Sequence, residues 1–181
     1  MLAGLPIEVQ TLGDYPPVAP PEETGSTFAE NARQKALFYA DHVRSLTVAE
    51  DSGLEIDRLG GRPGVHSARF GGDTTYPEKF TLIEEELRHV PTEDRTARFV
   101  CALAVAEGGR IVFEARGTVE GLIAAEPRGT GGFGYDPIFY YPPFGGTLAE
   151  AGDRQSSVSH RAKAFRQLRA FLEGRLRERS G

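Results

Sequence analysis

Carboxylate side chains cluster in the first third of the chain, where they could bind a cation. One of them, Asp51, directly follows residues 47–50, which we expect to form a short strand. A carboxylate at the end of such a strand is energetically costly unless it meets a cation or hydrogen-bond donors. Mg²⁺ prefers oxygen ligands, and proteins usually hold it with one or two carboxylates and substrate phosphates. The acidic residues of this cluster are Glu22, Glu23, Glu50, Asp51 and Asp57.

This acidic cluster has two interpretations. It is either a Mg²⁺ site suited to a triphosphate, or a common strand-end turn in which Asp51 is capped through Ser52 and Gly53. Composition alone favours neither.

A second candidate site lies where the last predicted helix begins. Ser159 is placed as its N-cap, so His160 and Arg161 occupy the first turn. The free N–H groups and the macrodipole of that turn favour anions rather than cations. An oxygen-rich ligand would remove the conflict. Exposure to solvent would also reduce it to a few tenths of a kcal/mol, so both interpretations stay open.

The glycine-rich stretch of residues 129–134 matches the G-x-G-x-x-G pattern of dinucleotide-binding folds. That interpretation requires a strand before the glycines and a helix after them. Pro127 lies just upstream, and Pro137, in a downstream segment of β-type composition, forbids the helix. We therefore predict a flexible loop whose backbone can approach a ligand or another strand.

The predicted elements must bring these groups together. Thr27 and Glu30 form a capping-box pattern, and apolar residues at helical spacing then predict a helix over residues 28–43. Asn31 and Lys35 lie one turn apart on this helix, so they could share one ligand. Alternation of apolar and polar residues predicts a strand over residues 7–12.

Further elements follow along the chain. A second helix is expected from Thr75-Tyr76-Pro77, with Pro77 in its first turn. Residues 98–106 and 110–119 predict a β-hairpin that turns at Gly108-Gly109. The last helix is expected over residues 160–177.

Composition bounds the function. With 181 residues and a net charge of −5, the chain has no overall positive field to hold a nucleic-acid backbone. The single cysteine excludes an internal disulfide and favours a reducing, cytoplasmic location. No apolar run approaches the length of a membrane span, so we expect no membrane partner.

Several motifs in one order resemble the inosine triphosphate pyrophosphatase family, which hydrolyses non-canonical purine nucleoside triphosphates. The resemblance spans nearly the whole chain from Pro21 onward. It rests on Glu22-Glu23-Thr24-Gly25-Ser26-Thr27-Phe28 with Glu30-Asn31 and Lys35, Asp51-Ser52-Gly53-Leu54, Gly60 to Arg69, Gly131 to Phe139, and Ser159-His160-Arg161.

The resemblance implies a mixed α/β fold with an elongated, curved central mixed sheet flanked by helices. It also implies two lobes with a cleft between them, and a homodimer. The implied reaction is Mg²⁺-dependent hydrolysis of ITP, dITP or XTP to the nucleoside monophosphate and pyrophosphate.

The family's functional residues carry over by position. Glu23 matches the metal-binding acid and Lys35 the phosphate-binding lysine, while Asp51 matches the acid that binds metal and activates water. Ser52 matches an adjoining substrate contact. The segment that packs on the nucleoside corresponds to Phe133, Gly134, Tyr135 and Asp136, with the Phe133 ring against the base. The residues at the base edge correspond to His160 and Arg161.

Two features depart from the family pattern. Family members begin with a strand and a Thr/Ser-x-Asn-x-x-Lys loop that binds the triphosphate, and Met1 falls after that place. The family usually has a lysine five residues before the histidine that corresponds to His160, and this chain has Gln155 there. The neighbouring Arg154 is the candidate substitute for that lysine. The domain prediction is one pyrophosphatase domain over residues 1–181 lacking that strand and loop. The alternative function is a nucleotide-binding dimer with little or no turnover.

Overall fold

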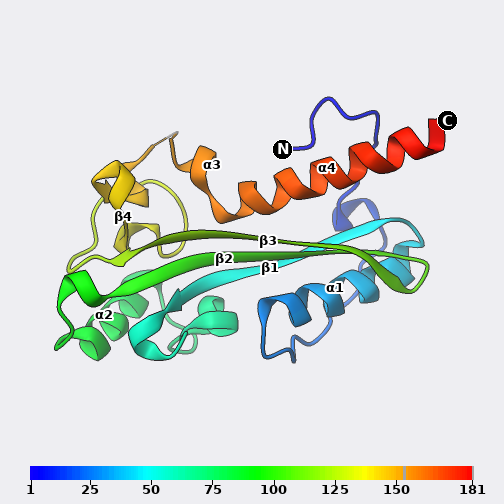
Figure 1. Cartoon of the computed structure of the whole chain (residues 1–181). Coiled ribbons are helices and arrows are strands. Elements are labelled where there is room, and N and C mark those ends of the chain that lie inside the picture. The colour runs from blue at the N-terminus through cyan, green and yellow to red at the C-terminus, as the bar shows by residue number, and fades with distance from the viewer. Residues whose placement is uncertain (153, 181) are drawn as a thin grey trace. The chain divides into compact units, whose positions relative to one another are not determined.

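The chain folds into two compact units. Figure 1 labels the helices and strands. The computed structural model describes residues 1–152 and 154–180, and describes only the backbone at 156, 179 and 180. Unit 1 comprises Met1–Asp51, Ala102–Arg116 and Lys163–Gly181, and unit 2 comprises Ser52–Cys101 and Gly117–Ala162. Each unit is described below by itself.

The described residues form helices and strands in a mixed order. The helices are α1 (Phe28–Val43), α2 (Tyr76–Leu87), α3 (Arg154–Val158) and α4 (His160–Ser180). The strands are β1 (Thr47–Ile56), β2 (Thr96–Glu107), β3 (Arg110–Ile123), β4 (Phe139–Tyr141) and β5 (Gly146–Thr147). The strands form one sheet in the order β1-β2-β3-β4-β5. Across the described residues, no helix has both the length and the apolar character needed to cross a membrane.

Helix α1 forms as its sequence predicts. The Thr27 side chain accepts a hydrogen bond from the Glu30 backbone N–H, and the Glu30 carboxylate accepts one from the Thr27 N–H. The helix ends at Arg44, which has a left-handed φ of 53° and donates its N–H to the Ala40 carbonyl. Its buried face carries Phe28, Asn31, Ala32, Ala36 and Ala40. The apolar spacing in the sequence therefore determined both the helix and its buried side.

In unit 1, α1 and the C-terminal part of α4 run on opposite sides of the strands (Figure 1). Residues 102–106 of β2 are consequently buried on both faces, and they form a continuous small and apolar run. Leu168 and Leu172 of α4 are buried.

The predicted hairpin is confirmed. Strands β2 and β3 turn at Gly108 and Gly109, whose φ angles of 57° and 75° suit the tight turn that favours glycine. Both strands are longer than predicted. The mixed α/β class is also confirmed, while the β3–β4 and β4–β5 pairs are antiparallel where a mixed sheet was expected. The elongated curvature and the cleft stay predictions.

Unit 2 has its own hydrophobic core. Helix α2, predicted from Thr75-Tyr76-Pro77, starts at Tyr76 and buries Phe80, Ile83 and Leu87. These side chains pack against apolar residues of the strand segments and of the region around β4. The core comprises Leu54, Ile56, Phe80, Ile83, Leu87, Ala97, Phe99, Val119, Ile123, Tyr135, Ile138, Phe139 and Leu148.

The predicted strand over residues 7–12 is wrong. Residues 7–11 have no regular structure, and a 3-10 turn follows at Leu12–Asp14. The Asp14 carboxylate accepts hydrogen bonds from the N–H and the hydroxyl of Thr11, which satisfies the local backbone without a neighbouring strand. Val9 is 65% exposed, so the alternating pattern does not mark a buried face here.

Two other predictions need correction. Strand β1 continues to Ile56, so Asp51, Ser52 and Gly53 lie inside a strand and not in a capped turn at its end. The segment after the glycine loop is a 3-10 turn at Asp136–Ile138 before it becomes β4. Pro137 is compatible with that turn because its fixed φ suits a first turn, where its missing N–H has no partner to lose.

Candidate active site

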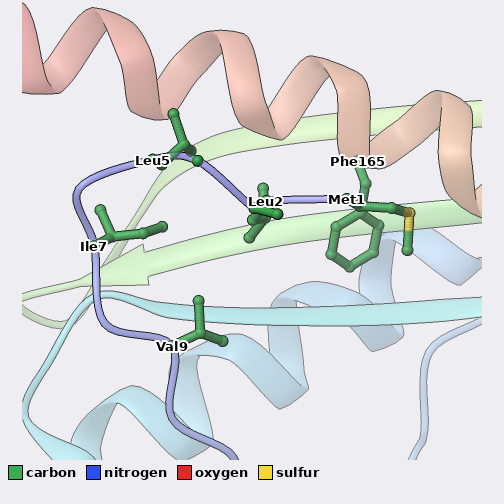
Figure 2. Close-up of a pocket in the computed structure, with 8 residues that line it drawn as sticks. Met1, Leu2, Leu5, Ile7, Val9 and Phe165 are labelled. Atoms are coloured by element: carbon green, nitrogen blue, oxygen red, sulfur yellow. The ribbon is translucent and has the colours of Figure 1, made fainter.

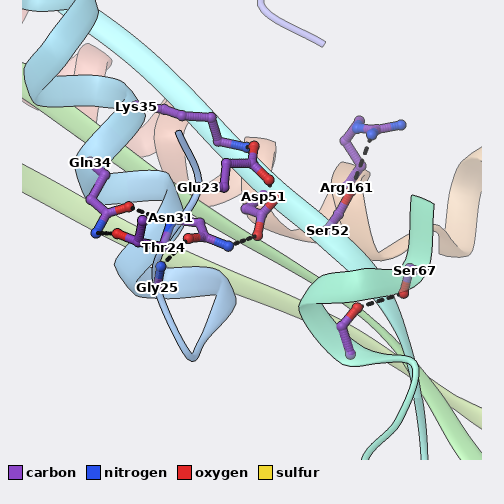
Figure 3. A network of polar contacts seen from close by, with 11 residues as sticks. Glu23, Thr24, Gly25, Asn31, Gln34, Lys35, Asp51, Ser52, Ser67 and Arg161 are labelled. Atoms are coloured by element: carbon purple, nitrogen blue, oxygen red, sulfur yellow. Dashed lines mark hydrogen bonds and ion pairs between the residues drawn. The ribbon is translucent and has the colours of Figure 1, made fainter. Parts of the chain in front are cut away.

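An ion-paired cluster in unit 1 brings together the three residues predicted for metal and phosphate binding. The Lys35 Nζ lies 2.8 Å from Glu23 Oε1 and 3.0 Å from Asp51 Oδ1 (Figure 3). Their side chains are 18%, 31% and 12% exposed, respectively. Residues separated by up to 28 positions thus converge on one ammonium group at the edge of solvent.

Asn31 holds the other oxygen of Asp51. It is fully buried, and its Nδ2 donates to Asp51 Oδ2 at 3.0 Å. Its Oδ1 accepts the backbone N–H of Gly25 at 2.8 Å, which fixes the amide orientation. Asn31 and Lys35 therefore share one hydrogen-bond partner, the Asp51 carboxylate. A bound ligand shared by the two side chains stays a prediction.

Gly25 is required by this arrangement. A Cβ at that position would lie 2.6 Å from Asn31 Oδ1 and 2.9 Å from the Asn31 backbone nitrogen. A larger residue would therefore push the loop away from the amide that orients Asp51. The sequence carries no separate signal for this close approach.

The electrostatics of the cluster favour a cation. Burial alone would lower the pKa of Lys35, but the hydrogen bonds that its ammonium donates to Glu23 and Asp51 outweigh burial and raise the pKa above its ordinary value. Lys35 is therefore charged. Two carboxylates face this single ammonium, which leaves attraction for a further positive charge.

The donor set fits Mg²⁺ bound together with a substrate. Glu23 and Asp51 supply hard carboxylate oxygens that converge on one point. No group of three or more His, Cys, Asp or Glu residues suited to a metal is found in the described part of the chain. Two carboxylates match the usual protein share of a Mg²⁺ shell that phosphate and water complete.

In unit 2, the start of α4 contacts β1. The Ser159 hydroxyl accepts the Ala162 N–H at 3.0 Å, which confirms the predicted N-cap. The Arg161 guanidinium lies 3.4 Å from the Ser52 hydroxyl. The His160 ring stacks on Phe99, with centroids 5.0 Å apart and planes 17° apart. These contacts hold both basic side chains at the start of α4.

The glycine loop of unit 2 presents an aromatic ring to solvent. Phe133 is 79% exposed and lies between Gly132 and Gly134, whose φ angles are 75° and 65°. Tyr135 is buried, and its hydroxyl donates to the Ser67 carbonyl at 2.7 Å. Burial raises the pKa of Tyr135 well above its ordinary value, so the phenol stays protonated.

Asp136 closes this loop. It is 4% exposed and accepts hydrogen bonds from the Phe133 N–H at 2.7 Å and from Gln155 Nε2 at 2.6 Å. Burial raises the pKa of Asp136, and these two donors oppose the shift. Arg154, the suggested substitute for a lysine, lies over the Phe144 ring at 4.7 Å, and Gln155 makes the contact with Asp136 instead.

An apolar pocket of unit 1 lies beside the N-terminal segment (Figure 2). It is lined by Met1, Leu2, Ala3, Gly4, Leu5, Ile7, Val9 and Phe165. None of these side chains can transfer a proton or bind a phosphate. This pocket therefore supplies no group for catalysis.

Comparisons with known proteins agree on one family. A family model described as the Ham1 family matches residues 1–171. A dITP/XTP pyrophosphatase of Geobacillus kaustophilus is 51% identical over 164 residues, covering 90% of this chain and 80% of that protein. One of Thermus thermophilus is 46% identical over 177 residues, covering 96% and 84%. A solved HAM1 protein from Coxiella burnetii has a TM-score of 0.82 and 41% identity, covering 87% and 82%.

Proposed function

This chain belongs to the Ham1 family, and on that premise we propose that it is a Mg²⁺-dependent nucleoside triphosphate pyrophosphatase. The resemblance inferred from its motifs is confirmed by relatives named dITP/XTP pyrophosphatase. Its reaction is the hydrolysis of ITP, dITP or XTP to the nucleoside monophosphate and pyrophosphate. The observation that carries the proposal is the convergence of Glu23 and Asp51 on Lys35.

Asp51 is the proposed general base. One of its carboxylate oxygens is fixed by the buried Asn31 amide, so the carboxylate keeps one orientation while the other oxygen faces Lys35. A carboxylate held in this way can accept a proton from a water that attacks the α-phosphate, which leaves pyrophosphate as the departing group. Bound Mg²⁺, held by Glu23 and Asp51, would neutralise phosphate charge and polarise the attacked phosphorus.

Lys35 is the proposed phosphate-binding residue. Its ammonium is charged and partly exposed, and its current partners are the two carboxylates proposed to bind the metal. When a metal occupies those carboxylates, their attraction for the ammonium falls, and a phosphate oxygen becomes the better partner for Lys35. The cluster is thus arranged to exchange an internal ion pair for a metal–phosphate complex.

Base selection is proposed for unit 2. His160 and Arg161 supply hydrogen-bond donors suited to the 6-keto group of hypoxanthine or xanthine, and Phe133 supplies a ring for the base, with Gly134, Tyr135 and Asp136 forming its loop. The 6-amino group of adenine would leave such donors unpaired. A buried unpaired polar group costs roughly 1–3 kcal/mol, so ATP is the poorer substrate.

The test is pyrophosphate release from ITP and from ATP, with and without Mg²⁺. We expect Mg²⁺-dependent release from ITP, with a specificity constant well above that for ATP. Equal rates for the two nucleotides would contradict the base assignment, and full activity after removal of all divalent metal would contradict the metal assignment.

The alternative function, a nucleotide-binding dimer with little turnover, is not supported by the relatives, which are named for the pyrophosphatase reaction. A homodimer follows from the family resemblance, and light scattering during size-exclusion chromatography tests it. The substrates belong to the cellular nucleotide pool, which supports a cytoplasmic location.

A further inference from the structure

The ring proposed to contact the base is poorly held by its own loop. Phe133 is 79% exposed, and glycines with left-handed φ angles flank it on both sides. Asp136 fixes the Phe133 backbone N–H, but this bond leaves the side-chain torsions free. A planar ring that must meet a planar base needs a further contact to keep its orientation.

Tyr76 makes that contact from α2. Its ring lies edge-on to Phe133, with centroids 5.9 Å apart and planes 67° apart. It also meets the buried Tyr135 edge-on, at 5.3 Å and 89°. A Cβ at Gly134 would lie 3.5 Å from the Tyr76 hydroxyl and 3.6 Å from two ring carbons, so the same ring covers the loop backbone.

Tyr76 is itself fixed. It begins α2 directly after the Thr75 cap, whose backbone N–H donates to Glu78 at 2.7 Å. Its ring also packs 6.3 Å from that of Phe80, a core residue. Burial of Tyr76 raises the pKa of its hydroxyl, so the ring stays neutral. Tyr76 therefore links a rigid helix start to an exposed ring on a glycine loop.

We propose that Tyr76 is a positioning residue that sets the orientation of Phe133 for the purine base. The inference rests on the proposed function, since it takes Phe133 as the ring that packs on the base. In a T-shaped pair the partially positive edge of one ring meets the partially negative face of the other, so the pair of Tyr76 and Phe133 favours one relative orientation. An aliphatic side chain of similar reach fills space without this preference.

The first test compares Tyr76→Leu with Tyr76→Phe. The leucine variant removes the aromatic ring, while the phenylalanine variant keeps the ring and loses only the hydroxyl. We expect Tyr76→Leu to raise the KM for ITP by about 2- to 12-fold, the range that corresponds to an aromatic pair, with kcat little changed. Tyr76→Phe should remain near the wild-type KM.

A ligand without a base separates positioning from general damage. Inorganic tripolyphosphate competes through the phosphate contacts alone, so its inhibition constant should be the same in the wild type and in both variants. Equal KM values for ITP in the leucine and phenylalanine variants would overturn the inference. An equal weakening of tripolyphosphate binding in the leucine variant would also overturn the inference, because it would indicate a purely structural role for Tyr76.

A second test works without turnover. The chain has no tryptophan, so Phe133→Trp introduces a single fluorescent reporter at the ring in question. Its fluorescence anisotropy should fall when Tyr76→Leu is added and not when Tyr76→Phe is added. Unchanged anisotropy overturns the inference whatever the enzyme hydrolyses. Wild-type protein that releases no pyrophosphate from ITP, together with the expected anisotropy change, would count against the proposed function alone.

Discussion

Replacing Asp51 with asparagine tests the proposed base and the geometry around it. In the wild type, Oδ1 accepts from Lys35 Nζ and Oδ2 accepts from Asn31 Nδ2, each at 3.0 Å. An asparagine has one acceptor oxygen and one NH₂ group. Because the Gly25 N–H fixes Asn31 with its own NH₂ toward Asp51, the new NH₂ faces a donor in either orientation.

The magnitudes follow from this mismatch. One hydrogen bond to a charged group is lost, which costs about 1.5–3 kcal/mol of unfolding free energy. For a chain of this length, each kcal/mol lowers Tm by about 2–4 °C. Turnover should fall at least about 100-fold, since the amide can neither accept the proton nor carry the metal-binding charge.

The assay is the initial rate of pyrophosphate release from ITP at saturating Mg²⁺, measured well below the Tm of the variant. Asp57→Asn is the matched control, because Asp57 also accepts hydrogen bonds from Thr96 and Arg98, at 2.7 and 2.8 Å, but pairs with those residues and not with Lys35. The control should keep its turnover. Turnover of Asp51→Asn within a few-fold of the wild type would refute the reasoning, as would an equal loss in the control.

Three other outcomes are expected. Arg161→Ala should narrow the preference for ITP over ATP, because it removes a donor proposed for the base edge; an unchanged ratio of specificity constants would remove that role. Glu23→Gln should raise the Mg²⁺ concentration that gives the half-maximal rate by at least about tenfold. Loss of a residue that only hydrogen-bonds to a metal ligand already lowers metal affinity by about 10- to 100-fold, and Glu23 is proposed as a ligand itself. A Mg²⁺ titration of the rate checks this. Hydrogen bonds from Arg98 and Thr96 hold the pKa of Asp57 below its usual 3.8, so its contribution to stability is present above about pH 4 and is lost as pH falls through the folded pKa. Urea unfolding between pH 2.5 and 6 should therefore show a shallower acid loss in Asp57→Asn than in the wild type, and identical slopes would show that the Asp57 pairing adds no stability.

Local sequence patterns were sufficient to predict several helices and strands of the fold. The Thr27 and Glu30 capping box and the alanines of α1 were sufficient to predict that helix, because caps and helical spacing act within a few residues of the chain. The hairpin at Gly108-Gly109 was equally readable, since its turn needs left-handed φ angles that glycine adopts readily. The motifs also sufficed to name the family.

Long-range contacts were decided only by the tertiary structure. The spacing of Asn31 and Lys35 placed the two side chains one turn apart, but it did not predict that both would contact Asp51. Nothing in the local pattern distinguished residues 7–11 from a strand, because a strand exists only where another strand accepts its hydrogen bonds. The sequence identified Tyr76 only as part of the start of a helix. Its contacts with Phe133 and Tyr135 join residues nearly 60 positions apart, and such contacts depend on packing between elements that sequence periodicity does not encode.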